Sequence, residues 1–136
     1  MQGNGSALAS LRNVEFCGAL REDEMLRLFA ESAVYVCTSR YEPFGLAPLE
    51  AALAGCAVLV RDIASLREVW EDAAIYFNDA HELSAMLTEL AIRPALLLEA
   101  QEQACRRAQL YTREQMTSTY QALYAQVLAK EHACVA

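Results

Sequence analysis

The sequence predicts an α/β domain of the doubly wound class, in which helices cover both faces of a parallel sheet. Short apolar runs rich in β-forming residues alternate with longer segments of helical periodicity. The composition is typical of an ordered, helix-rich protein, because 55% of the residues are hydrophobic and only five are glycine and three proline. With 136 residues, the chain is long enough for one domain with its own core.

Four short apolar segments are expected as strands of this partial sheet. They cover residues 14–16, 33–37, 57–60 and 74–77. Helical patterns follow or separate them at residues 22–32, 45–54, 79–92, 94–110 and 112–130, with a further short helix opening at Ser65. Strands that alternate with helices in this way form a parallel sheet, whose ligands bind at the carboxyl ends of the strands.

Capping patterns support several of these helices. Gly55 is placed to end the helix 45–54, because glycine accepts the left-handed conformation that closes many helices. Three capping residues are followed by Glu or Gln three positions later, as in a capping box. These pairs are Ser65–Glu68, Asp79–Glu82 and Thr112–Gln115.

The most distinctive segment, residues 38–51, joins the strand 33–37 to the helix 45–54 and reads Thr-Ser-Arg-Tyr-Glu-Pro-Phe-Gly-Leu-Ala-Pro-Leu-Glu-Ala. The backbone N–H groups at the start of this helix are expected to point beyond the strand end, where the helix dipole favours an anion. Gly45 lets a bulky ligand approach the backbone closely. Glu42 lies on the loop, and Glu50 lies about 7.5 Å further along the helix. Such a site suits an elongated ligand that carries a diphosphate and hydroxyl groups at both ends.

The string Ser-x-x-Glu-Pro-Phe-Gly-Leu-x-x-x-Glu-Ala-x-x-x-Gly, which begins at Ser39, resembles the donor-sugar signature of retaining glycosyltransferases. These enzymes have the GT-B fold, which consists of Rossmann-like domains, and carry a Glu-x7-Glu motif. They are classified as glycosyltransferases of group 1 or of the family 4 type. The resemblance implies transfer of a hexose from a nucleotide-diphosphate sugar to an acceptor hydroxyl with retention. By this resemblance Glu42 is catalytic and faces the transferred sugar. Phe44, Gly45 and Leu46 offer backbone amides to the donor, and Glu50 holds the ribose.

The resemblance runs from Asn13 to about Leu128 and covers only the later part of a donor-binding domain. Residues 1–136 are therefore expected to be a partial domain, with a lead-in at 1–12, an α/β body at 13–110 and a C-terminal helix at 111–131. The first two strands of the family's domain, with the Arg and Lys that clamp the diphosphate, have no counterpart. Ala57 stands where the family usually has Pro, and residues 62–65 lack its Gly-rich turn.

The missing strands have structural consequences. Strand 33–37 is expected to have an open apolar edge, which pairs either with strand 14–16 or with another chain, including a second copy. The last helix would normally cross to the absent acceptor domain, so it is expected to expose an apolar stripe. The chain is then a fragment, a split subunit or a degenerate relative that contacts a membrane only through the absent domain.

Charge and cysteine content limit the partners. The net charge of −7 argues against nucleic acid, so any phosphate site must be local. Arg40, Arg61 and Arg67 are the candidates near strand ends, and ordinary solvated loop arginines are the alternative. His81 and His132 are too isolated to be metal ligands, so neither a metal nor a cofactor is expected besides the donor sugar. The five cysteines are odd in number and have no C-x-x-C spacing, which suggests reduced thiols. The first ten residues lack the basic start and apolar core of a signal peptide, so a cytoplasmic location is expected.

Two functions from different classes remain open. In the first, the chain is the donor-binding part of a glycosyltransferase and is inactive alone. In the second, it is a non-catalytic Rossmann-like partner or pseudo-enzyme that binds another protein. The second requires only structural roles for the two carboxylates, with Glu42 as a helix cap and Glu50 as an exposed helix residue. A phosphate-switch or flavodoxin-like protein fits less well, because the required acidic cluster or phosphate loop is missing.

Overall fold

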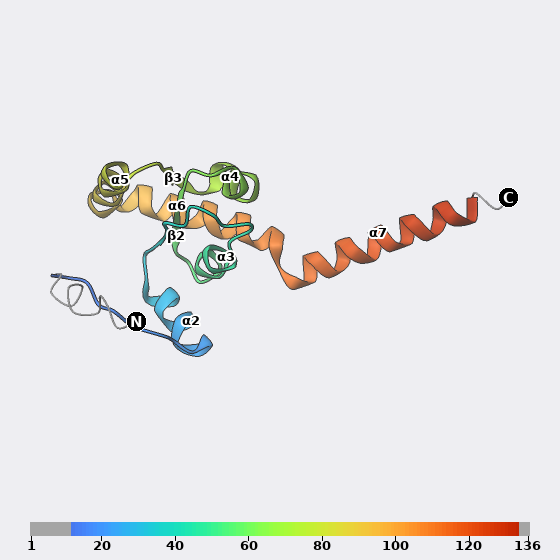
Figure 1. Cartoon of the computed structure of the whole chain (residues 1–136), viewed down its shortest axis with the longest axis horizontal. Helices are drawn as coiled ribbons and strands as arrows, with labels where there is room; N and C mark the ends of the chain where they lie inside the picture. Colours follow the sequence, from blue (N-terminus) through green and yellow to red (C-terminus); the bar gives the residue numbers. More distant parts are fainter. Residues whose placement is uncertain (1–11, 134–136) are drawn as a thin grey trace, which may run out of the picture.

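The computed structural model describes residues 12–133, with side chains to residue 129, and it is an α/β structure (Figure 1). Residues 1–11, which make up most of the expected lead-in, and residues 134–136 lie outside the described part. The elements, in chain order, are α2 (Glu22–Glu31), β1 (Val34–Cys37), α3 (Leu46–Leu53), β2 (Ala57–Arg61), α4 (Ala64–Trp70), η1 (Glu71–Ala73), β3 (Ile75–Phe77), α5 (Ala80–Ile92), α6 (Pro94–Ala108), η2 (Gln109–Tyr111) and α7 (Arg113–Ala133).

The three strands form one parallel sheet in the order β1-β2-β3. Val34 of β1 pairs with Ala57 of β2, and Arg61 at the end of β2 pairs with Phe77 of β3. β2 is the central strand and is almost completely buried, whereas β1 lies at an edge, as the sequence predicts. The parallel sheet and its helices confirm the predicted fold class.

The alternation of side chains along the strands divides the core between the two faces of the sheet. Val58 and Val60 point to one face, where α3, α4 and α6 cover them. Leu59 points to the other face and packs with Phe77 and with Leu90 of α5. Helices on both faces explain why β2 is apolar along its length rather than alternating.

The segment 14–16 is not a strand, which corrects one of the four expected strands. Val14 and Phe16 are 50% and 55% exposed, and the segment has no regular secondary structure. A strand is stable only when its backbone groups find a partner, and this segment does not pair with β1. Direct pairing of the two segments was one of two expectations for the β1 edge, and the structure does not contain it.

The helix starts agree with the sequence in two of three cases. The Asp79 carboxylate accepts hydrogen bonds from the N–H groups of His81 and Glu82, at 2.8 and 2.9 Å, and so caps α5. The Thr112 hydroxyl accepts the N–H of Gln115 at 3.3 Å at the start of α7. The expected capping box at Ser65 and Glu68 is wrong. α4 begins at Ala64, so Ser65 lies inside the first turn, where its hydroxyl is directed to another segment.

Helix α7 extends away from the body of the molecule (Figure 1). The apolar stripe predicted for it is exposed and consists of Met116, Tyr120, Leu123, Tyr124, Val127 and Leu128. Within the described range, no helix combines the length and hydropathy needed to cross a bilayer.

Candidate functional site

The distinctive loop, residues 38–45, lies at the carboxyl edge of the sheet between β1 and α3. Parallel strands place the segments after β1, β2 and β3 at this same edge, which is where ligands bind in such sheets. The Arg61 guanidinium connects two of these segments. Its Nε donates to the carbonyl oxygen of Thr38 at 3.4 Å, and its Nη1 donates to that of Asn78 at 2.9 Å.

Gly45 is fixed at the start of α3 by its backbone conformation and by its neighbours. It is the N-cap residue and has a φ of +86°, which residues with a Cβ rarely adopt. A Cβ at this position would lie 3.2 Å from both Leu66 Cδ2 of α4 and Pro48 Cγ. The loop therefore packs closely on α4, and this contact requires glycine.

Glu42 forms hydrogen bonds with the start of α3 and with α4. Its carboxylate accepts the Gly45 N–H at 3.1 Å, and its carbonyl oxygen accepts the Ser65 hydroxyl at 2.6 Å. The sequence predicts that the amides of Phe44, Gly45 and Leu46 all point beyond the strand end. The amide of Gly45 instead donates to Glu42, which is the capping role that the sequence left open for this carboxylate.

Glu50 lies on α3 and is half-buried. Burial of the Tyr35 hydroxyl raises the pKa of that phenol, and the negative charges of Glu42 and Glu50 raise it further. Both carboxylates are therefore within electrostatic reach of one β1 side chain. The sequence did not single out Tyr35, whose pKa responds to both glutamates.

The side chains of Phe44 and Leu46 face the C-terminal helices. The Phe44 ring meets the Tyr111 ring edge-on, with 5.4 Å between centroids and 76° between planes. A pocket of about 400 Å³ lies between the loop, α3 and the start of α7. It is lined by Phe44, Leu46, Leu49, Leu110, Tyr111, Gln115, Met116, Thr119 and Tyr120. Sequence reasoning missed Tyr111 and the role of Ser65, and no local pattern connects either with the loop.

The other arginines differ in their availability to an anion. Arg67 forms a bidentate ion pair with Asp62, which lowers the pKa of that carboxyl group, and its guanidinium lies 4.2 Å from the centre of the Tyr76 ring. The Arg67 guanidinium is thus occupied by protein contacts. The Arg61 guanidinium is also occupied, because it donates to the carbonyl oxygens of Thr38 and Asn78. Arg40 is exposed on the loop itself. Among residues 12–129, no cluster of three or more His, Cys, Asp or Glu side chains is arranged to hold a metal ion.

Comparison with known proteins identifies the family to which the chain belongs. The family described as "Glycosyl transferases group 1" matches residues 6–109. The "Serotype-specific mannosyltransferase WbdA" of Escherichia coli is 34% identical over 91 residues, which cover 65% of this chain and 11% of that protein. The "Glycogen synthase" of Mycobacterium tuberculosis is 43% identical over 58 residues, or 43% of this chain and 14% of that protein.

The "Uncharacterized 41.2 kDa protein in cps region" of Klebsiella pneumoniae is 29% identical over 118 residues, which cover 82% of this chain and 32% of that protein. The chain thus spans between 11% and 32% of the length of these curated relatives. Because the family match extends over most of its residues, the chain belongs to the glycosyl transferases group 1 family.

Proposed function

We propose that the chain is the donor-binding part of a retaining glycosyltransferase of the GT-B type. The complete enzyme transfers a hexose from a nucleotide-diphosphate sugar to an acceptor hydroxyl. The observation that carries the proposal is the loop with Glu42 and Gly45 at the carboxyl edge of a parallel sheet, followed by Glu50 on α3, in a chain of this family. Two relatives are named as a mannosyltransferase and a glycogen synthase, and both names describe enzymes that transfer sugars.

The chemistry assigns a role to each part of the loop. Glu42 faces the transferred sugar, where its negative charge stabilises the positive charge that develops during transfer. The amides of Phe44, Gly45 and Leu46 and the N-terminus of α3 bind the sugar hydroxyls and the leaving diphosphate. Glu50 accepts hydrogen bonds from the ribose. Because the Gly45 N–H already donates to Glu42 at 3.1 Å, donor binding exchanges this internal hydrogen bond for one to the ligand.

The chain alone supplies only one side of the reaction. The acceptor is held by a further domain or partner chain, which is also the part that contacts a membrane where the acceptor is in one. We propose no metal and no cofactor beyond the donor, no nucleic acid partner, and self-association only through the β1 edge. We propose a cytoplasmic location, because five cysteines without a C-x-x-C or paired spacing suggest reduced thiols.

The proposal is tested by NMR titration of the chain with UDP-glucose, ADP-glucose and GDP-mannose. We expect shifts of the amides of residues 42–50 with one donor, and their loss in Glu50→Ala. Glu89→Ala is the matched control, because Glu89 is also a helical carboxylate but lies on α5, at the opposite face of the sheet. Shifts that persist in Glu50→Ala would remove the ribose role of Glu50.

The same titration separates the enzyme from the non-catalytic alternative. Absence of shifts with all three donors, in a folded sample, would favour a module that only binds another protein. We expect binding to be weak and sugar transfer by this chain alone to be absent. Detectable transfer of radiolabelled hexose by the isolated chain would contradict that part of the proposal.

A further inference from the structure

The distinctive loop rests on two supports that come from distant parts of the chain. One is Ser65 on α4, whose hydroxyl donates to the carbonyl oxygen of Glu42 at 2.6 Å. The other is Tyr111 in η2, whose ring meets the edge of Phe44 at a centroid distance of 5.4 Å. The supports act on residues 42 and 44, directly before Gly45. Together they set the direction in which the chain enters α3.

The Tyr111 ring is itself held at its hydroxyl end. The hydroxyl donates to the carbonyl oxygen of Val69 on α4 at 3.2 Å and accepts from Arg107 Nη2 at 3.1 Å. A hydroxyl that donates to one group and accepts from another has its hydrogen position fixed. Because both partners belong to other helices, the orientation of the ring does not depend on its contact with Phe44.

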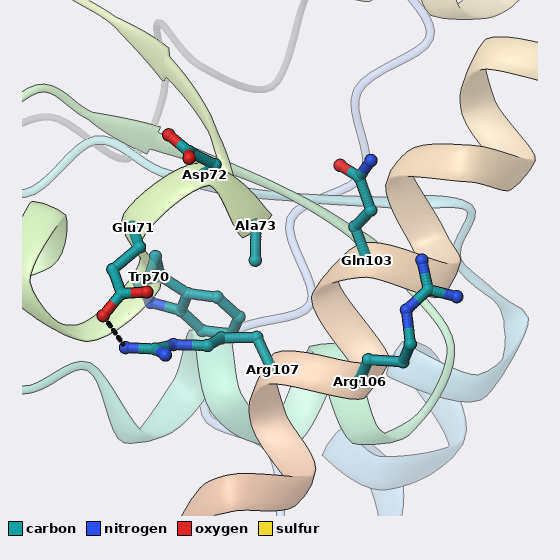
Figure 2. A pocket seen from close by; sticks show the side chains of 7 residues that line it. All are labelled: Trp70, Glu71, Asp72, Ala73, Gln103, Arg106 and Arg107. Carbon is teal, nitrogen blue, oxygen red and sulfur yellow. Dashed lines mark hydrogen bonds and ion pairs between the residues drawn. The ribbon is translucent and has the colours of Figure 1, made fainter.

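Arg107 connects these helices. Its Nε donates to the Val69 carbonyl oxygen at 2.6 Å, its Nη2 pairs with the Glu71 carboxylate at 2.9 Å, and its side chain is only 17% exposed. Figure 2 shows this side chain crossing from α6 below the Trp70 ring to Glu71. A charged side chain buried to this extent is stable only when it is hydrogen-bonded, and these partners bind the Nε and Nη2 groups of the guanidinium.

The Glu71 end of this connection is an unusual backbone position. Glu71 follows α4 with a φ of +48°, which is rare for a residue other than glycine. This conformation ends α4 directly after Trp70, and the Glu71 side chain pairs with Arg107 there. The ion pair therefore joins the end of α4 to α6, and through Tyr111 to the loop.

We propose that Tyr111, held by Arg107, is a positioning residue for donor binding. It keeps Phe44 against the C-terminal helices, so that the amides of residues 44–46 and the Glu42 carboxylate keep their relative positions. This proposal rests on the donor-binding role of the loop. It goes further by assigning the geometry of the loop to a contact with η2, outside the signature segment.

The test uses the complete 136-residue chain with Tyr111→Leu, which removes the ring, and Tyr111→Phe, which keeps the ring and removes the hydroxyl. Tyr124→Leu is the matched control, because Tyr124 is an exposed tyrosine of α7 that does not line the pocket beside the loop. The first readout is hydrogen exchange of the Gly45 amide, which donates to Glu42. The second readout is the Kd of the donor that wild type binds, among UDP-glucose, ADP-glucose and GDP-mannose.

An aromatic pair of this geometry corresponds to a change of about threefold to tenfold in a binding constant. We therefore expect Tyr111→Leu to raise the donor Kd and to speed Gly45 exchange by about that factor, with β2 amides unchanged. Tyr111→Phe should recover most of the loss in Kd, because the ring contact with Phe44 remains. Tyr124→Leu should match wild type in both readouts.

The proposal would be overturned if Tyr111→Leu had the same exchange rate of the Gly45 amide and the same donor Kd as wild type. Faster exchange at β2 as well would also overturn it, because the effect would then be general destabilisation. Arg107→Lys provides a second variant, since it keeps the charge but cannot make all the guanidinium contacts. It should speed Gly45 exchange less than Tyr111→Leu does. If wild type binds none of the three donors, the proposed function fails, while the exchange rates still decide the positioning role.

Discussion

The close packing of Gly45 on α4 predicts a specific difference between two glycine substitutions. Gly45 and Gly55 flank α3 and have φ values of +86° and +104°, so alanine is strained at both positions. A Cβ at Gly55 would have no heavy atom within 4 Å, whereas a Cβ at Gly45 would lie 3.2 Å from Leu66 and Pro48. Gly55→Ala therefore measures the backbone strain alone, and Gly45→Ala measures the strain and the steric contact together.

The expected magnitudes follow from these two contributions. Left-handed backbone costs a residue with a Cβ about 1–2 kcal/mol, which is the expected loss for Gly55→Ala. Overpacking a buried contact costs a further 1–3 kcal/mol or so. Leu66 is completely buried and cannot move away freely, so we expect Gly45→Ala to lose about 2–5 kcal/mol in total.

Urea unfolding followed by tryptophan fluorescence measures both variants. Trp70 is the only tryptophan, is completely buried, and belongs to the same core cluster as Leu66. With a urea dependence of about 1–3 kcal/mol per molar, the midpoint for Gly45→Ala should lie roughly 1 M below that for Gly55→Ala. Equal midpoints would refute the reasoning, because they would show that α4 does not press against the loop at this point.

Three further predictions concern single side chains. The backbone N–H groups of Glu82 and His81 hold the pKa of Asp79 below its usual value, so its contribution to stability is present above about pH 4 and is lost as pH falls through the lowered pKa. Thermal unfolding of Asp79→Ala should therefore occur at a lower temperature than wild type at pH 7, and the difference should be smaller at pH 2; an equal difference at both would contradict this. Burial raises the pKa of Cys56, whose thiol donates to the Phe29 carbonyl oxygen, so a disulfide reagent at pH 8 should modify the exposed Cys17 and leave Cys56 unmodified in mass spectra of the folded protein. Leu66→Ala should lose about 2–5 kcal/mol in urea unfolding, and a loss below 1 kcal/mol would be incompatible with its complete burial.

The parts of the fold that local patterns determine could be predicted from the sequence. β2 is recognisable because a strand buried on both faces is apolar along its whole length. The start of α5 follows from Asp79, whose carboxylate caps the nearest free N–H groups. In both cases the physical cause lies within a few residues, so the sequence contains it.

The errors have a different origin. Val14 and Phe16 are apolar enough for a strand, but a strand also needs a neighbour, which no local pattern reveals. Ser65 and Glu68 have the spacing of a capping box, but the Ser65 hydroxyl donates instead to Glu42 on a distant segment. Local spacing alone could not distinguish a cap from a tertiary hydrogen bond, because serine can make either.

The same distinction applies to the candidate site. The signature string identifies Glu42, Gly45 and Glu50, whose roles remain predictions. It does not reveal that both carboxylates raise the pKa of Tyr35 or that the Tyr111 ring meets the Phe44 ring. These neighbours come from β1 and from η2, and only the folded chain brings them to the loop.

The position of these contacts bears on how much of the donor site can function without an acceptor domain. The loop is held by Gly45, by Ser65 and by Tyr111, all within the described part of this chain. Its geometry therefore does not depend on a second domain. The resemblance implies that an Arg and a Lys clamp the diphosphate from two further strands of the donor-binding domain, and this chain has no counterpart of those strands. Donor binding should then be weakened but still specific, while transfer, which needs an acceptor, should be lost. A donor-binding signal that appears only after an acceptor domain is added would show that the loop is not preorganised, and that the contacts to α4 and η2 are insufficient to hold it.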